Sequence, residues 1–274
     1  MDSEILVCEK NDKLYPIRFL ERKGLPERFY YKGDISFLND FRSVAIIGSR
    51  NAPKEAILSA YASGQYAAME GFAVANGLAV GCDTAALRGA LSEGGRCVAV
   101  LPCGLDMVVP SVNEYLAQEI LEKGGCLISE YAAGTEPEKY RYVQRDRLQS
   151  GLSEAVLVVH YGKVESRSDS FMSDLASNNT RHLTGQTSNQ DAAQLRFSPK
   201  IVAKNRKDSG SLKTAEYARK QGVKVLSYKG AEGGEDDVLP FAETLADPEA
   251  FRSFLKNYVP GEAFVYEQMR LPFL

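Results

Sequence analysis

Short apolar runs alternate with longer amphipathic stretches from residue 43 onward, and this rhythm is the strongest signal in the chain. Six runs are apolar almost throughout, at residues 44–47, 72–75, 97–101, 126–129, 155–159 and 223–226. The intervening patterns predict helices near residues 53–70, 83–92, 112–122 and 211–221. Strands that are apolar on both faces and alternate with helices are typical of parallel sheets. The chain is therefore predicted to be an α/β protein with a doubly wound, mostly parallel sheet and helices on both faces.

Three segments lie outside that rhythm. Residues 1–42 are an aromatic-rich lead-in to a main domain at residues 43–229. Residues 164–207 are rich in Ser, Asn, Thr and Gln, and they are predicted to be an irregular insertion. It is either a flexible surface loop or an extension of a ligand surface, because residues 196–207 carry five basic side chains and no acid. Residues 230–274 are predicted to be an acidic tail with a short helix.

The net charge of −3 argues against a strongly basic nucleic-acid binder, but the average is misleading. Residues 230–274 contain nine acidic and three basic side chains, so the tail carries −6 and the first 229 residues carry +3. The composition, 44% hydrophobic and 25% charged, is that of an ordinary globular protein. The lack of a long apolar run and of a signal peptide predicts a cytoplasmic protein without a membrane span.

Several kinds of chemistry have little support in the residues. The five cysteines form no C-x-x-C pair, and two histidines are few for a metal site or a Ser-His-Asp triad. There is no P-loop, no G-x-S-x-G nucleophile elbow and no G-x-G-x-x-G, so the Rossmann-like sheet carries no dinucleotide signature. We expect no metal, no cofactor and no catalytic residue.

Loops after the strands hold the candidate ligand contacts, because such sheets bind ligands at the carboxyl ends of their strands. Gly48, Ser49 and Arg50 follow the first run, and a glycine before a helix favours anion contact. Gly77 and Gly81 follow the second run. The alternatives are a plain turn with a solvated arginine, and a loop whose Asp83 is only a helix N-cap.

Cations and tyrosines interleave in the loop predicted after residue 129. Lys139, Arg145 and Arg147 lie among Tyr140 and Tyr142, a mixture that suits single-stranded nucleic acid. A solvated loop with tyrosines packed underneath is the alternative. After the insertion, a helix opens on three small residues that favour an anion, namely Ser209, Gly210 and Ser211.

Six ordered motifs together make the chain resemble the DprA/Smf family of DNA-processing proteins. They are V-A-I-I-G-S-R (44–50), N-G-L-A-V-G-C-D-T-A-A-L-R-G-A-L (76–91), V-A-V-L-P-C-G-L-D (98–106), S-E-Y-A-A-G-T (129–135), R-D-R-L-Q-S-G-L-S (145–153) and S-G-S-L-K-T-A (209–215). The resemblance implies an extended Rossmann-like domain that binds single-stranded DNA, forms a homodimer and loads a RecA-type recombinase. It implies DNA contacts at Ser49, Arg50, Lys139, Arg145 and Arg147, with backbone or hydroxyl contacts from Gly48 and residues 209–211.

The chain departs from the family pattern at Leu87, where a histidine is usual, and in its insertion and acidic tail. Three hypotheses follow. The first is a single-stranded DNA-binding recombination mediator, which acts in DNA uptake or a related process. The second is a sensor of a nucleotide-derived small molecule, in a defence or mobile-element system. The third is an enzyme using Glu130 or Asp83, although the P-G-G-x-G-T-x-x-E segment of related phosphoribohydrolases is missing.

Overall fold

The computed structural model describes residues 4–161, 209–231 and 239–259. One nine-stranded sheet runs through them in the order β1-β2-β6-β5-β4-β3-β7-β8-β9. The strands are β1 (Leu6–Glu9), β2 (Arg28–Gly33), β3 (Arg42–Gly48), β4 (Phe72–Asn76), β5 (Cys97–Val100), β6 (Cys126–Ser129), β7 (Ala155–His160), β8 (Lys224–Tyr228) and β9 (Glu243–Leu245). The helices are α1 (Ile17–Glu21), α2 (Phe37–Asp40), α3 (Lys54–Met69), α4 (Cys82–Ser92), α5 (Glu114–Glu122), α6 (Lys139–Leu152), α8 (Ser209–Lys220) and α9 (Pro248–Lys256), with a 3-10 turn η1 at Ser111–Asn113.

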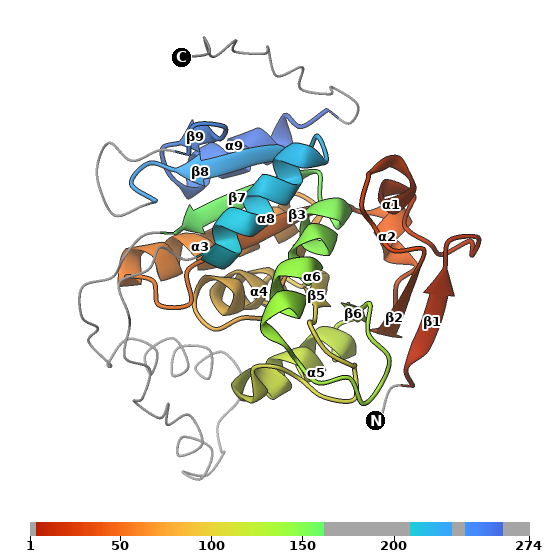
Figure 1. The fold of residues 1–274 in the computed structure, drawn as a ribbon. Helices are drawn as coiled ribbons and strands as arrows, with labels where there is room; N and C mark the ends of the chain where they lie inside the picture. Colours follow the sequence, from red (N-terminus) through yellow and green to blue (C-terminus); the bar gives the residue numbers. More distant parts are fainter. Residues whose placement is uncertain (1–3, 162–208, 232–238, 260–274) are drawn as a thin grey trace, which may run out of the picture.

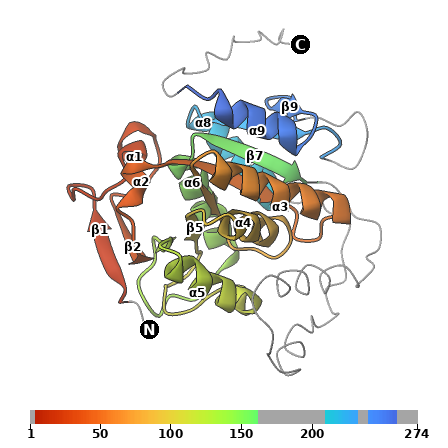
Figure 2. The ribbon, with the colours of Figure 1, turned by 180° about the vertical axis from the view of Figure 1, so that it is seen from behind.

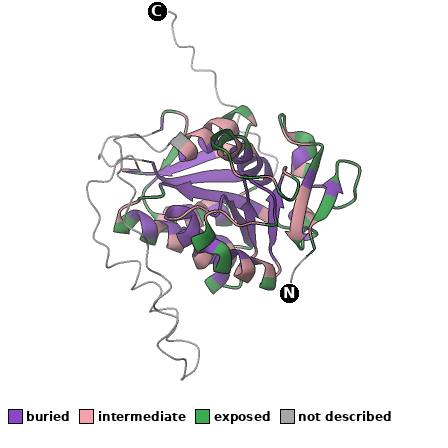
Figure 3. Cartoon of the chain, turned by 60° about the horizontal axis from the view of Figure 1, so that its bottom comes forward, coloured by how far each residue is buried: buried purple, intermediate pink, exposed green. Residues whose placement is uncertain are grey.

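All six predicted strands are present and mutually parallel, which confirms the fold class. β3 lies between β4 and β7, and the pairing runs in parallel from β6 to β9. β4, β5, β6 and β7 are buried along their whole length, and they form the purple centre of the molecule in Figure 3. Apolar side chains on both faces of a strand require a helix layer on each side.

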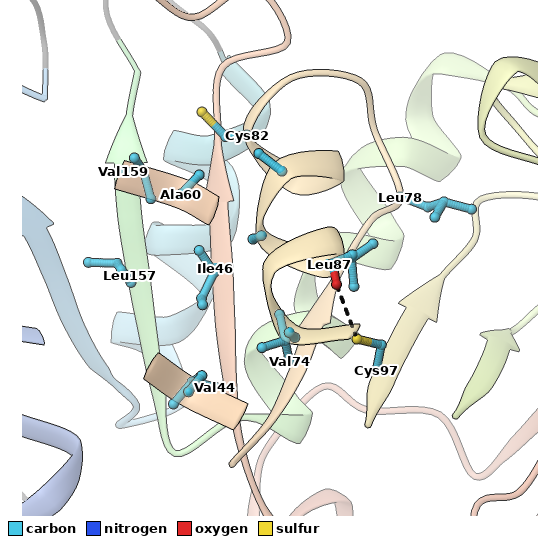
Figure 4. Close-up of a cluster of buried hydrophobic side chains, with 14 of the residues drawn as sticks. Val44, Ile46, Ala60, Val74, Leu78, Cys82, Leu87, Cys97, Leu157 and Val159 are labelled. Carbon is cyan, nitrogen blue, oxygen red and sulfur yellow. Dashed lines mark hydrogen bonds between the residues drawn. The ribbon is translucent and has the colours of Figure 1, made fainter. Parts of the chain in front are cut away.

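Helices supply both layers. α6 and α8 lie side by side on one face of the sheet (Figure 1), while α3, α4 and α9 cover the other (Figure 2). On the α3–α4 face, Val44, Ile46 and Leu157 pack with buried residues of α4 such as Leu87 (Figure 4). Leu87 has no exposed surface, so this departure from the family pattern is a core residue.

The lead-in extends the sheet. β1 pairs with β2, and β2 pairs with β6, both antiparallel. Arg22, just after α1, donates hydrogen bonds from Nη1 to the carbonyl oxygens of Ser150 (3.0 Å), Gly151 (2.6 Å) and Ser153 (2.8 Å). These carbonyls lie at the end of α6, where backbone oxygens lose the N–H partners of a following helical turn; of the three, that of Ser150 also accepts from the N–H of Ser153 at 3.1 Å. The arginine therefore fastens the lead-in to the main domain.

Part of the predicted acidic tail belongs to the core. β9 pairs with β8, and α9 buries Phe251 and Leu255. Arg252 of α9 donates to Glu70 at 2.8 Å, which links α9 to the end of α3. The expected short helix is present, whereas the insertion with its five basic residues lies outside the described residues. No helix in the described part of the chain combines the length and the apolar character that a membrane crossing needs.

Candidate functional site

The carboxyl ends of the parallel strands meet at one edge of the sheet, and the predicted loops meet there with them. α3, α4, α6 and α8 all begin at this edge, because each follows a strand of the parallel set. Helix N-termini carry partial positive charge and unpaired N–H groups, so their convergence favours an anionic ligand. Among the described residues, no group of three His, Cys, Asp or Glu side chains is placed to hold a metal ion.

In the loop after β3, the three predicted residues have different environments. A side chain at Gly48 would meet the Sγ of Cys82 at 2.7 Å, so the glycine allows α4 to approach. Ser49 is buried, and its N–H and hydroxyl both donate to the carbonyl of His160, at 2.8 and 3.3 Å. Arg50 is exposed, and its guanidinium lies 5.5 Å from the centroid of the Tyr142 ring. Of these three, only Arg50 offers its side chain to a ligand.

The two glycines of the loop after β4 face the protein interior. The N–H of Gly77 donates to Oδ2 of Asp83 at 3.0 Å, and that oxygen also accepts from Ala79 at 3.4 Å. Gly81 has a φ of +86°, and a side chain there would lie 2.5 Å from the carbonyl oxygen of Ser49. Asp83 thus closes the loop that precedes α4. The N–H of Gly77 is already donated, so the predicted anion contact at this residue has no support in the structure.

Arg145 is buried, contrary to the expected solvent-facing role. Its side chain is 6% exposed, and Nη1 donates to the carbonyl oxygen of Val100 at 2.6 Å. The guanidinium lies against Gly77, where a Cβ would be 1.6 Å from Nη1, and Nε is 3.1 Å from Oδ1 of Asp146. Arg145 therefore joins α6 to the ends of β4 and β5. Its DNA contact stays a prediction, for which the side chain has little exposed surface.

Arg147 is committed to a neighbouring carboxylate. Its Nη2 lies 2.5 Å from Oε1 of Glu130, and the two side chains are 21% and 15% exposed. The partly buried pair neutralises the charge of both groups. This is the same Glu130 that the enzyme hypothesis required as an acid or base.

Helix α6 replaces the loop predicted for residues 139–147. Lys139 is its first residue, is exposed and has no ion pair with any described residue. Arg141 lies 5.1 Å from the centroid of the Tyr131 ring and 5.3 Å from that of Tyr140, and pairs with Glu138 at 2.9 Å. Burial raises the pKa of the Tyr131 hydroxyl, and the Glu130 carboxylate raises it further. That hydroxyl is therefore protonated at neutral pH.

The first turn of α8 contains the remaining predicted residues. α8 begins at Ser209, Ser211 is buried, and the hydroxyl of Thr214 donates to the carbonyl of Gly210 at 3.3 Å. These residues lie at the expected helix N-terminus, and their contact with an anion stays a prediction. The pairing of Arg50 with Tyr142 had no signal in the sequence, since 92 positions separate the two residues.

Comparison with known proteins places the chain in a family. The family model for DNA recombination-mediator protein A matches residues 6–185. The chain belongs to this family. DNA processing protein DprA of Streptococcus pneumoniae is 35% identical over 147 residues, 54% of this chain and 51% of the relative. Protein Smf of Escherichia coli is 33% identical over 149 residues, 54% of this chain and 40% of the relative. The matched part thus spans about half of these family members or less.

Solved structures of family members share the fold. DNA processing protein A of Streptococcus pneumoniae superposes with a TM-score of 0.64 at 24% identity, covering 93% of this chain and 75% of the other. DNA processing protein A of Helicobacter pylori, whose structure concerns its single-stranded DNA binding mode, gives a TM-score of 0.65 at 21% identity, covering 94% and 99%. At these identities the likeness establishes the Rossmann-like architecture.

Proposed function

We propose that the chain binds single-stranded DNA along the carboxyl edge of its sheet, as a recombination mediator without catalysis of its own. The observation that carries this proposal is the pair formed by Arg50 and Tyr142. Arg50 is exposed and has no carboxylate partner among the described residues. A cation beside an aromatic ring provides a phosphate contact and a stacking surface at one point, which is how proteins hold single strands without reading their sequence.

Other described groups support an extended anionic ligand. Lys139 lies three residues before Tyr142 on α6, so one helix face carries both the exposed cation and the ring. The N-termini of α3, α4, α6 and α8 add their partial positive charge at the same edge. Arg145 and Arg147 contribute through position rather than contact, because each guanidinium is largely buried and already bonded to the protein, Arg145 to Val100 and Asp146, and Arg147 to Glu130.

The test is fluorescence anisotropy with labelled single-stranded and double-stranded oligonucleotides at two salt concentrations. We expect affinity for single strands that falls steeply with salt, because bound phosphates release counterions. Arg50→Glu should weaken binding to all sequences alike. Lys256→Gln is the control, since this half-exposed cation at the end of α9 lies 3.8 Å from Glu70 at the C-terminal end of α3, away from the edge where α3 begins. If Arg50→Glu binds the oligonucleotides as tightly as the wild type at moderate salt, the assignment of the DNA site to Arg50 is wrong.

Two parts of the proposed function concern protein partners. We expect a homodimer, and we expect a RecA-type recombinase to be recruited to the bound strand. Light scattering on the purified protein tests the first. Recombinase filament formation on strands precoated with a single-strand-binding protein tests the second. A small-molecule sensor would instead be stabilised by mononucleotides and not by oligonucleotides in a thermal-shift experiment, a result that would contradict DNA binding.

A further inference from the structure

A hollow lies between residues of α6 and α8, the two helices that lie side by side in front of the sheet in Figure 1. One wall comes from α6 and the other from α8. The residues that line it are Val143, Lys213, Glu216, Tyr217 and Lys220. None of them belongs to the site described above, although Val143 directly follows Tyr142.

The lining combines cations with flat apolar surfaces. Lys213, Tyr217 and Lys220 are spaced by four and three residues, which puts them on one face of α8. The ammonium group of Lys220 lies 5.9 Å from the centroid of the Tyr217 ring. Val143 is 36% exposed and supplies an aliphatic surface opposite. Two cations that flank a ring repeat the chemistry of Arg50 and Tyr142 at a second place.

The volume of the hollow limits the kind of ligand that it can hold. Its volume is about 170 Å³, whereas sites that enclose a free small molecule are typically about 300–1,000 Å³. A free nucleotide therefore would not be enclosed. One unit of an extended polymer fits better, because the rest of the polymer is held elsewhere.

The hollow is also continuous with the candidate interface. Lys139 and Val143 are four residues apart on α6, so they are neighbours on one helix face. A strand that passes over the N-terminal half of α6 thus meets Lys139 first and the hollow next. α8 has a net positive charge, since it contains three basic residues, Lys213, Arg219 and Lys220, and one acid, Glu216.

We propose that this hollow, called here the α6–α8 groove, is a second contact site for the same single strand. In it, one base packs between Tyr217 and Val143, and the flanking phosphates lie near Lys213 and Lys220. The inference rests on the proposed function. Lys213 already pairs with Glu216 at 2.8 Å, but the two side chains are 45% and 42% exposed. Exposed ion pairs are weak, so a phosphate is able to replace the carboxylate.

The experiment measures affinity against strand length. Oligothymidylates of about 4 to 16 nucleotides cover the usual site sizes, and they are titrated against the wild type, Lys213→Gln/Lys220→Gln and the control Lys256→Gln. We expect wild-type affinity to rise until the strand is long enough to reach the groove. The double variant should bind short strands like the wild type and gain less from added length, and its salt slope should fall by about 1.4 for two lost phosphates.

Glu216→Gln provides an independent measurement that a structural defect would not mimic. It removes a negative charge from the groove and releases Lys213, so it should tighten binding of long strands by about two- to fivefold. Identical length dependence in the wild type and the double variant, or no gain from Glu216→Gln, would overturn the groove proposal. Absence of binding by the wild type at every length would instead overturn the proposed function.

Discussion

Replacing Arg145 by methionine separates a DNA contact from a positioning role. Methionine keeps much of the aliphatic volume and removes the guanidinium. In the structure that group donates to the Val100 carbonyl at 2.6 Å and lies 3.1 Å from Asp146, with both charged side chains under 8% exposed. The change therefore removes a charge-assisted hydrogen bond and leaves a buried carboxylate without its cation.

The expected loss of stability follows from those contacts. Breaking a buried ion pair by removing one partner costs about 3–5 kcal/mol. We expect about 3 kcal/mol here, because Gln149 still donates to Asp146 at 3.1 Å. For a chain of this size, that loss corresponds to a decrease of roughly 6–12 °C in Tm. Arg145→Met/Asp146→Asn removes the carboxylate charge as well, and should recover part of the loss.

The decisive measurement is the salt dependence of DNA binding, at a temperature where every variant is folded. Arg145→Met should lower affinity without changing the slope of log Kd against log salt, since no phosphate contact is lost. Arg50→Gln should leave Tm unchanged and reduce that slope by about 0.7. A variant of Arg145 that melts within about 1 °C of the wild type and reduces the slope as Arg50→Gln does would refute the reasoning.

Four further predictions rest on the packing. Gly77→Ala should destabilise the fold by several kcal/mol, because its Cβ would lie 1.6 Å from Nη1 of Arg145. Calorimetry should show a smaller loss of stability when the same substitution is made in the Arg145→Met variant, because the effects of substitutions at contacting residues are not additive. Arg22→Ala should cost about 3 kcal/mol in urea unfolding, because it removes three hydrogen bonds to carbonyls at the end of α6. An unchanged midpoint would contradict this cap. All five thiols are buried, so a thiol reagent should label the protein only as it unfolds. Burial raises the pKa of Cys8 and of Cys103 to about 11. Because each folded-state pKa exceeds the unfolded value, the contribution of these thiols to stability is complete below about pH 8.5 and is lost as the pH rises toward 11. Urea unfolding midpoints measured against pH should show this loss.

The polar face of α6 illustrates where sequence reasoning failed. The helix buries Arg145, Asp146 and Gln149 along with Leu148 and Leu152, so its inward side has no continuous apolar stripe. Hydrophobic periodicity detects a helix only when the buried face is apolar. The pattern therefore predicts a loop here, with arginines exposed to DNA or to solvent.

The sequence by itself determined the six central parallel strands of the sheet, β3 to β8. Strands buried on both faces must be apolar throughout, and this makes them visible as runs whose order and loops predict the fold. It also determined that cations and glycines gather at one edge. Only the tertiary structure decided which cations are available, because the groups that hold a guanidinium in place include residues far apart in sequence. Arg145 is held by Val100, 45 positions away, and Arg147 by Glu130, whereas Arg50 meets only the ring of Tyr142 among the described residues. A residue type gives the charge of a side chain, and its neighbours in space decide whether a ligand can use that charge.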